Sequence, residues 1–157
     1  INSAYPNCRG VYLSFDERLM VWINEEDHLR IISLEKSSDI SSVYKRLCQT
    51  VTALNQNLDF AWDSTYGNLT SCPTNIGTAM RAGVHIHLEK LEKNKDILFK
   101  LINGYNLQIR GTCGEKTKIQ NAVFDISNYQ RFGVSESEIL LNLHAGLVAI
   151  IKAEQNL

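Results

Sequence analysis

The sequence predicts an α+β fold in which helices cover one face of a mostly antiparallel β-sheet. Two short apolar segments near its start, Gly10 to Phe15 and Leu19 to Ile23, are separated only by Asp16-Glu17-Arg18, which is typical of a hairpin. Strand-like and helix-like segments then alternate, but an early hairpin argues against a purely parallel sheet. The 157 residues are 44% apolar and 21% charged, which fits one globular domain with a core of its own.

A third strand is expected at Leu29 to Leu34, followed by a helix. Ser37-Ser38-Asp39 supplies the side-chain oxygens that cap a helix N-terminus. The apolar residues that follow recur at intervals of three and four, so this helix is amphipathic and packs on another element. These residues are Ile40, Val43, Tyr44, Leu47, Val51 and Leu54. Phe60 to Trp62 and the turn Tyr66-Gly67-Asn68 then lead to a loop at Cys72.

The second half of the chain adds strands and two helices. The strands are expected at Met80 to Leu88, Leu107 to Ile109 and Val123 to Ile126. A helix is expected from Asn94 to Asn103, because Gly104 can end it. Ser135 and Glu138 form a capping box, which predicts a long C-terminal helix.

Charge and hydropathy exclude several classes of protein. The formal net charge is −1, which gives no electrostatic basis for binding nucleic acid or an anionic membrane. The longest apolar run, Leu147 to Ile151, is too short to span a bilayer. The four cysteines form no Cys-x-x-Cys pair, so we expect neither a zinc site nor a disulfide framework. Reduced thiols and no recognisable secretory signal lead us to expect a cytoplasmic protein.

The densest group of ionisable residues is Asn24 to Arg30, with sequence NEEDHLR. It lies between two apolar strand segments, Leu19 to Ile23 and Ile31 to Leu34. Burying charge between such segments is costly unless the charges are paired or used. We therefore interpret this stretch as part of a functional site.

This stretch resembles the NEEDHxR signature of the phosphagen kinases, the ATP:guanidino phosphotransferases that include arginine and creatine kinases. Two further blocks match in the same order. They are Cys72 to Thr78 with Arg81 to His85, and Arg110 to Glu115 with Val123 to Asn128. The similarity runs from about Gly10 to about Ala153. It implies the C-terminal catalytic domain of such a kinase, an antiparallel sheet flanked by helices, with MgATP or MgADP and a small guanidino compound as ligands.

Arg30, Arg81 and Arg110 each lie beside an apolar strand segment and could converge on a polyphosphate. Arginine suits this task because its planar fork grips phosphate oxygens and keeps its charge. Each arginine alone could also be an ordinary surface residue. The resemblance implies that all three contact the nucleotide phosphates. The implied nucleotide-binding residues are Arg30, Arg81, Ala82, Gly83, Val84, His85, Arg110, Gly111, Thr112 and Gly114.

Two histidines, His85 and His87, share one face of a strand because they lie two residues apart. We interpret His87 as a surface residue. His85 matches a histidine near the nucleotide in the family. The spacing offers no third ligand for a zinc ion, so no protein-bound metal is expected apart from the Mg²⁺ that accompanies the nucleotide.

A guanidinium acceptor is a poor nucleophile until its plane is fixed and its proton can leave. Two carboxylates that bracket it would serve both needs, and Glu26 and Glu115 are the candidates. The resemblance places Glu26 against the guanidinium. Glu115 occupies a position that is glutamate in arginine kinases and aliphatic in creatine kinases, which favours arginine as substrate. Glu25 and Asp27 are interpreted as structural or electrostatic partners.

Cys72 precedes Pro73-Thr74 in a loop. A lone cysteine is usually a buried structural residue, but a nearby hydroxyl and nearby cations could hold this one as a thiolate. The matching family cysteine touches the substrate guanidinium. We therefore count Cys72, with Glu26 and Glu115, among the catalytic and substrate-binding residues.

The match departs from the family in two places. Cys113 stands where arginine kinases carry a second arginine, and Lys116-Thr117-Lys118 replaces a more acidic stretch. We expect residues 1–157 to be an N-terminally incomplete catalytic domain without the helical domain that precedes it in whole phosphagen kinases. Two alternatives are a non-catalytic nucleotide-binding or interaction module, and a kinase that acts on arginine side chains in proteins.

Overall fold

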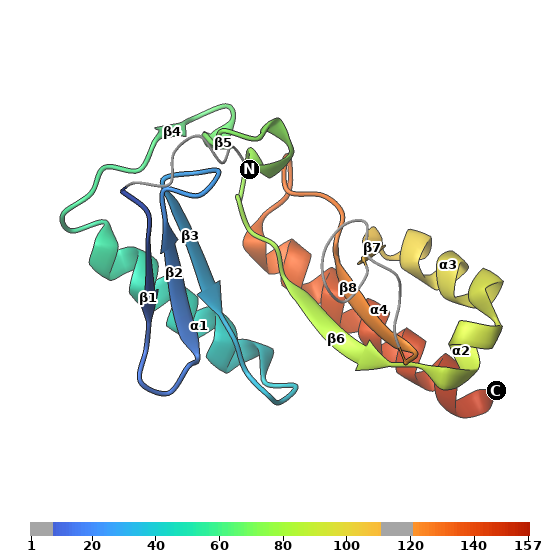
Figure 1. The fold of residues 1–157 in the computed structure, drawn as a ribbon. Coiled ribbons are helices and arrows are strands. Elements are labelled where there is room, and N and C mark those ends of the chain that lie inside the picture. Colours follow the sequence, from blue (N-terminus) through green and yellow to red (C-terminus); the bar gives the residue numbers. More distant parts are fainter. Residues whose placement is uncertain (1–7, 111–120) are drawn as a thin grey trace. The chain divides into compact units, whose positions relative to one another are not determined.

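The computed structural model describes residues 8–110 and 121–157. The chain divides into two compact units, Ile1–Thr74 and Asn75–Leu157. Elements of the first unit are β1 (Gly10–Leu13), β2 (Leu19–Ile23), β3 (Leu29–Ser33), α1 (Ile40–Leu54), β4 (Trp62–Asp63) and β5 (Gly67–Asn68). A 3-10 turn at Pro73–Asn75 lies at the division. Those of the second are β6 (Gly83–His87), α2 (Glu89–Lys93), α3 (Lys95–Gly104), β7 (Leu107–Arg110), β8 (Val123–Asn128) and α4 (Glu136–Asn156) (Figure 1).

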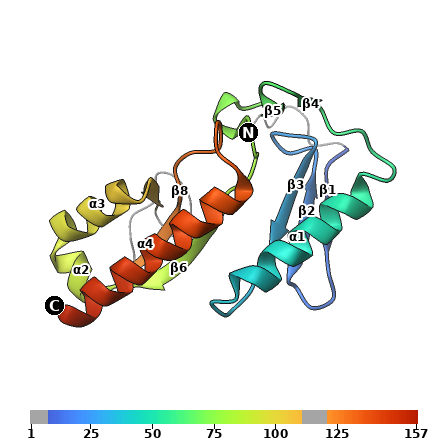
Figure 2. The same ribbon diagram turned by 180° about the vertical axis from the view of Figure 1, so that it is seen from behind.

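In the first unit β1, β2 and β3 form an antiparallel sheet in that order. Helix α1 covers one face of this sheet, as the view from behind shows (Figure 2). The Ser33 hydroxyl ties β3 to the helix by donating to the Val43 carbonyl oxygen at 2.9 Å. Asp39 caps α1, and its carboxylate accepts from the Ser42 amide at 3.0 Å. Hydrogen bonds from the Ser42 hydroxyl and then the Ser42 amide lower the pKa of Asp39.

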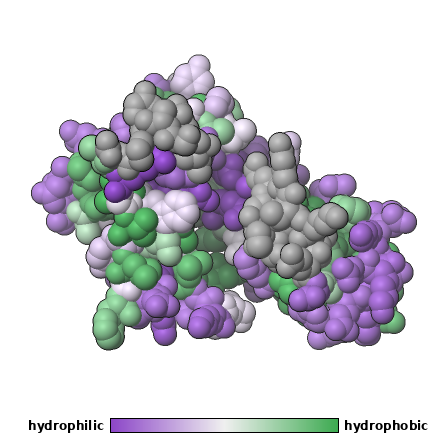
Figure 3. All heavy atoms as spheres, viewed as in Figure 1, coloured by the Kyte–Doolittle hydropathy of each residue, from purple (hydrophilic) through white to green (hydrophobic). Residues whose placement is uncertain are grey.

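The face of this sheet turned away from α1 is apolar and open in the first unit. Strand alternation places Val11, Leu13, Met20, Trp22 and Ile32 on it, since Val21 on the other face is buried. Val11 is 64% exposed and Leu13 is 47% exposed. Figure 3 shows apolar side chains gathered over these strands.

The second unit holds the hydrophobic core. Its strands pair antiparallel in the order β6, β8, β7, so the last strand in sequence lies in the middle. The core residues come from this sheet, the segment after β6 and the three helices. They are Leu88, Leu91, Leu98, Ile102, Leu107, Phe124, Ile126, Leu143 and Ile150. Within the described ranges, none of the helices is long and apolar enough to cross a membrane.

The predicted fold class, helices packed on antiparallel sheet, is confirmed, although the described strands belong to several small sheets. Strand β2 and the capping box of α4 are as predicted. The strand expected from Met80 to Leu88 is shorter, Gly83–His87. Before it, the Asn128 side chain replaces ladder hydrogen bonds: Nδ2 donates to the Met80 carbonyl oxygen at 3.2 Å, and Oδ1 accepts from the Ala82 amide at 2.9 Å. The short elements β4, β5 and α2 were not predicted.

Helix α2 depends on a side chain from α4. The two carboxylate oxygens of Glu154 accept hydrogen bonds from the Lys90 and Leu91 amides, both at 2.9 Å. Desolvation by burial acts to raise the pKa of Glu154, but these two amides and the Lys90 charge outweigh it, so the pKa lies below its ordinary value of 4.5. The stabilisation is therefore present above pH 4.5 and is lost as the pH falls through the lowered pKa.

We expect Glu154→Ala to lower the free energy of unfolding by about 1 kcal/mol at neutral pH, because two amides at a helix start lose their acceptor. Urea denaturation at neutral pH and at about pH 3 measures this, and the difference from the unchanged protein should shrink at the lower pH. Gln155→Ala, an exposed neighbour on the same helix, is the control. Equal urea midpoints for Glu154→Ala and the control would contradict the assignment.

Candidate active site

The loop between β2 and β3 carries the acidic residues of the NEEDHLR stretch. Ile23, the last residue of β2, pairs with Leu29, the first residue of β3, and the Asn24 amide donates to the His28 carbonyl oxygen at 2.9 Å. Asn24 has a φ of 55°, a left-handed conformation that asparagine adopts more readily than most residues. The hairpin therefore presents residues 25–27 at its tip.

The three carboxylates of this loop have different surroundings. Glu25, whose side chain is 14% exposed, lies 3.7 Å from the Arg30 guanidinium and accepts from the Glu26 amide at 3.0 Å. Asp27 accepts from the Ser71 amide at 2.6 Å. Glu26 is exposed, and within the described residues its carboxylate has no hydrogen bond or ion pair. Glu26 is thus the carboxylate of the three that is open to a ligand.

Arg30 lies on the open apolar face of the β1–β3 sheet. Its guanidinium carbon is 5.5 Å from the centre of the Trp22 ring, and the two residues are register partners across β2 and β3. A guanidinium over an indole ring is held by a cation–π interaction, and the Glu25 carboxylate lies 3.7 Å from the same guanidinium. The side chain is 55% exposed, so it can reach an anion in solvent.

The Cys72 segment lies beside the β2–β3 loop. The Asp27–Ser71 hydrogen bond connects the two. The Thr70 hydroxyl donates to the Cys72 carbonyl oxygen at 2.8 Å, and Cys72 Sγ lies 3.0 Å from Thr74 Oγ1. Thus the structure brings the loops of Glu26 and Cys72, two predicted substrate-binding residues, together in the first unit.

In the second unit the register of the sheet gathers the other predicted residues. His85 on β6 and Arg110 on β7 are both partners of Asp125 on β8. Gly83 and Gln108 are likewise partners of Ser127. Because Phe124 and Ile126 lie in the core, Asp125 and Ser127 point to the opposite face. We call this face, made by Gly83, His85, Gln108, Arg110, Asp125 and Ser127, the polar face.

Arg81 completes the polar face from just before β6. Its Nη2 lies 2.7 Å from both carboxylate oxygens of Asp125, and its Nε donates to Ser127 Oγ at 3.2 Å. His85 Nε2 is 3.8 Å from the same carboxylate. Asp125 is only 7% exposed, so its charge is buried but paired. Asp125 thereby fixes the direction of the Arg81 guanidinium.

Asp125 was not predicted as a site residue. It lies in the middle of the strand-like run Val123 to Asn128, where an acidic residue between Phe124 and Ile126 is the signal that could have identified it. An aspartate flanked by two core residues must face a partner or solvent.

Gly83 makes room on the polar face. A Cβ at this position would lie 2.9 Å from the Ser127 Cβ and 3.0 Å from the Ile126 carbonyl oxygen. We expect Gly83→Ala to lower the free energy of unfolding by about 1–3 kcal/mol, as overpacking does. Gly104→Ala, where a Cβ would meet nothing within 4 Å, should leave stability unchanged or raise it. Thermal unfolding compares the two variants, and equal melting temperatures would contradict the close approach.

The remaining predicted residues divide into two groups. The side chains of Ala82 and Val84 pack against the core, so these residues could contact a ligand on the polar face only through their backbone atoms. Gly111, Thr112, Gly114 and Glu115, together with Cys113 and Lys116 to Lys118, lie outside the described residues.

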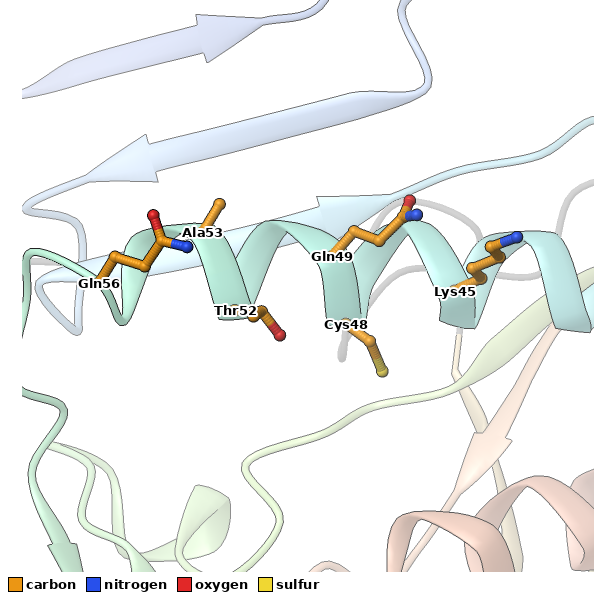
Figure 4. Close-up of a pocket in the computed structure, with 6 residues that line it drawn as sticks. All are labelled: Lys45, Cys48, Gln49, Thr52, Ala53 and Gln56. Carbon is orange, nitrogen blue, oxygen red and sulfur yellow. The ribbon is translucent and has the colours of Figure 1, made fainter.

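A metal cluster and a surface groove are two other features that can mark a functional site in the described residues. Among the described residues, no group of three His, Cys, Asp or Glu side chains could hold a metal ion. A groove of about 380 Å³ runs along α1 (Figure 4). It is lined by Lys45, Cys48, Gln49, Thr52, Ala53 and Gln56 and contains no predicted site residue.

Comparison with known proteins agrees with this picture. An arginine kinase of Limulus polyphemus is 44% identical over 96% of this chain and 42% of its own length. Arginine kinase 1 of Drosophila melanogaster is 44% identical over 98% of this chain and 43% of its own length. The chain therefore spans less than half the length of these curated relatives.

Two similar solved structures are also kinases of guanidino compounds. A duplicated taurocyamine kinase from Schistosoma mansoni, with bound transition-state analogue components, aligns with a TM-score of 0.94 and 35% identity, covering 99% of this chain and 22% of that one. A lombricine kinase aligns with a TM-score of 0.89 and 34% identity, covering 98% and 43%. Residues 1–157 match the family described as ATP:guanido phosphotransferase, C-terminal catalytic domain. The chain thus belongs to the ATP:guanidino phosphotransferase family.

Proposed function

We propose that this chain supplies the catalytic chemistry for reversible transfer of the γ-phosphoryl group of ATP to the guanidino group of arginine. The observation that carries the proposal is the polar face, where Arg81 and His85 lie against the buried carboxylate of Asp125 and Arg110 is the register partner of Asp125 on β7. A surface with fixed cations suits a polyphosphate, since phosphoryl transfer depends mainly on positioning and electrostatic stabilisation.

Among the guanidino substrates used within the family, arginine is the one proposed for this chain. The two curated relatives named above, both 44% identical, are arginine kinases. The taurocyamine and lombricine kinases that share the fold are 35% and 34% identical. Glu115, the glutamate typical of arginine kinases, adds to this preference.

In the proposed reaction Arg30, Arg81 and Arg110 bind phosphate oxygens. The hydrogen bonds to Asp125 preorganise the Arg81 side chain, so it loses less rotamer freedom when the nucleotide binds. Mg²⁺ fits as a companion of the nucleotide, because this ion is usually held by phosphates, water and few carboxylates, and it would neutralise phosphate charge. His85 and the backbone of Ala82, Gly83 and Val84 border the nucleotide.

The guanidinium is bound by Glu26 and Glu115, with the Cys72 sulfur as a third partner. A guanidino nitrogen attacks the γ-phosphorus in line, the bond from that phosphorus to the ADP oxygen breaks, and the N–H proton passes to a glutamate. Glu26 suits the acceptor role because its carboxylate is exposed at the tip of the β2–β3 hairpin.

Phosphorus NMR of the protein with MgATP and arginine tests the proposal. We expect an N–P resonance to appear and the γ-phosphate signal to fall, with weaker or no product from taurocyamine or lombricine. If MgADP binds but no N–P resonance forms with any of the three guanidines, the chain is a non-catalytic nucleotide-binding module and the proposal is wrong.

A further inference from the structure

The Asp27 carboxylate joins two segments that are far apart in the sequence. Its Oδ1 accepts from the amide of Ser71, 44 residues away, at 2.6 Å. We propose that Asp27 is a positioning residue, which holds the Cys72 segment at the β2–β3 loop so that Glu26 and Cys72 bind one guanidinium together. This inference rests on the proposed function for the identity of the ligand.

The two segments are each ordered locally, and the Asp27–Ser71 bond connects them. On one side, Asn24 Nδ2 donates to the Cys8 carbonyl oxygen at 2.7 Å, and Glu25 is paired with Arg30. On the other side, the Thr70 hydroxyl fixes the Cys72 carbonyl group. Rotation of either segment as a body would therefore move the Glu26 carboxylate and the Cys72 thiol relative to each other.

Asp27 acts here as a hydrogen-bond acceptor rather than as a charge paired with a cation. Among the described residues it has no ion pair, and its bond goes to a backbone amide. A carboxylate acceptor gives a shorter and stronger bond than a neutral one. Asparagine keeps an acceptor oxygen at the same distance from the backbone, whereas alanine has none. The Asp27→Asn variant therefore separates the effect of the hydrogen bond to Ser71, which we call the tether, from the effect of the negative charge.

Three variants test the inference: Asp27→Ala, Asp27→Asn and Ser71→Ala, which keeps the amide and serves as the control. Hydrogen exchange of the Ser71 amide, followed by NMR, reports the tether directly. Alkylation of Cys72 by iodoacetamide, followed by peptide mass spectrometry across pH with and without arginine, reports joint guanidinium binding. Steady-state kinetics give separate KM values for arginine and MgATP.

With Asp27→Ala we expect Ser71 exchange to rise about tenfold or more, in line with loss of a charge-assisted hydrogen bond. Arginine should no longer protect Cys72, and KM for arginine should rise about tenfold while KM for MgATP stays within about twofold. Asp27→Asn, which keeps a neutral acceptor in place of a charged one, should lose clearly less than Asp27→Ala on every measure, and Ser71→Ala should stay within about twofold of the unchanged protein. If Asp27→Ala does not fold, Asp27→Ser, whose hydroxyl is one bond shorter, replaces it.

Two results would overturn the inference. One is unchanged Ser71 exchange and unchanged Cys72 protection in the folded Asp27→Ala variant. The other is an Asp27→Asn variant as impaired as Asp27→Ala, which would make the charge decisive. Exchange and alkylation need no turnover, so a protein that makes no phosphoarginine yet shows the expected pattern refutes the proposed function and leaves the positioning role standing.

Discussion

Replacing Arg81 with alanine is expected to lower kcat/KM for phosphoryl transfer by about 10²–10³-fold, the usual loss when one preorganised electrostatic donor is removed. The side chain contributes a fixed cation on the polar face, and its direction is set by two 2.7 Å contacts with Asp125. Removal also leaves the buried Asp125 carboxylate without its main partner, so the variant loses stability as well. Coupled measurement of ADP formation with arginine gives the kinetic constants.

Two control variants separate these effects. Arg81→Lys keeps the charge but loses the planar fork, so it should recover stability more than activity. Asp125→Asn keeps the shape of the partner but removes its charge, so it should weaken MgATP binding with little effect on KM for arginine. If Arg81→Ala, once shown to be folded by circular dichroism, turns over at the rate of the unchanged protein, the assignment of Arg81 to the phosphates is wrong.

Replacing Glu26 with glutamine is expected to lower kcat by about 10²–10⁴-fold, the range typical of a lost general acid–base group. Glutamine can still accept a hydrogen bond from a guanidinium, but it cannot take up the proton or balance the positive charge. The loss should therefore appear in kcat and in KM for arginine, while KM for MgATP changes little. Steady-state kinetics with each substrate varied in turn measures the three constants.

Glu25→Gln is the matched comparison, because Glu25 is its neighbour in the same loop and pairs with Arg30 at 3.7 Å. Its effect should be smaller and should fall on KM for MgATP. Equal losses in the two variants, on the same constants, would show that the loop responds to any change of charge and that Glu26 has no special role.

The fold class and most long elements could be predicted because periodicity and capping are local properties. Helix α2 could not, because it is five residues long and its first amides are capped by Glu154 of α4 rather than by a nearby side chain. Leu88, the residue at its N-cap, has no side chain that could cap it. The short pair β4 and β5 was missed for a similar reason, since each strand has two residues.

In the candidate site, too, residues within local motifs could be predicted, whereas contacts between residues distant in the sequence could not. The motifs predict Arg81, His85 and Arg110 as site residues, and the structure places all three on the polar face. Asp125 can be their common partner only because β8 lies between β6 and β7, and the sequence does not reveal this strand order. The contact between Asp27 and Ser71 likewise joins residues 44 positions apart. Nothing local in the Asp27 segment indicates that Ser71 is its partner.

The alternation along β8 has a consequence for the molecules that reach the folded state. Phe124 and Ile126 face the core while Asp125 and Ser127 face the other way. A slip of one residue against β6 or β7 would exchange the two sets, placing a carboxylate among the leucines and a phenylalanine beside Arg81. Such a molecule would be too unstable to persist. The alternation along β8 therefore selects the correct strand register. A molecule with a shifted register unfolds again rather than accumulating as an inactive isomer.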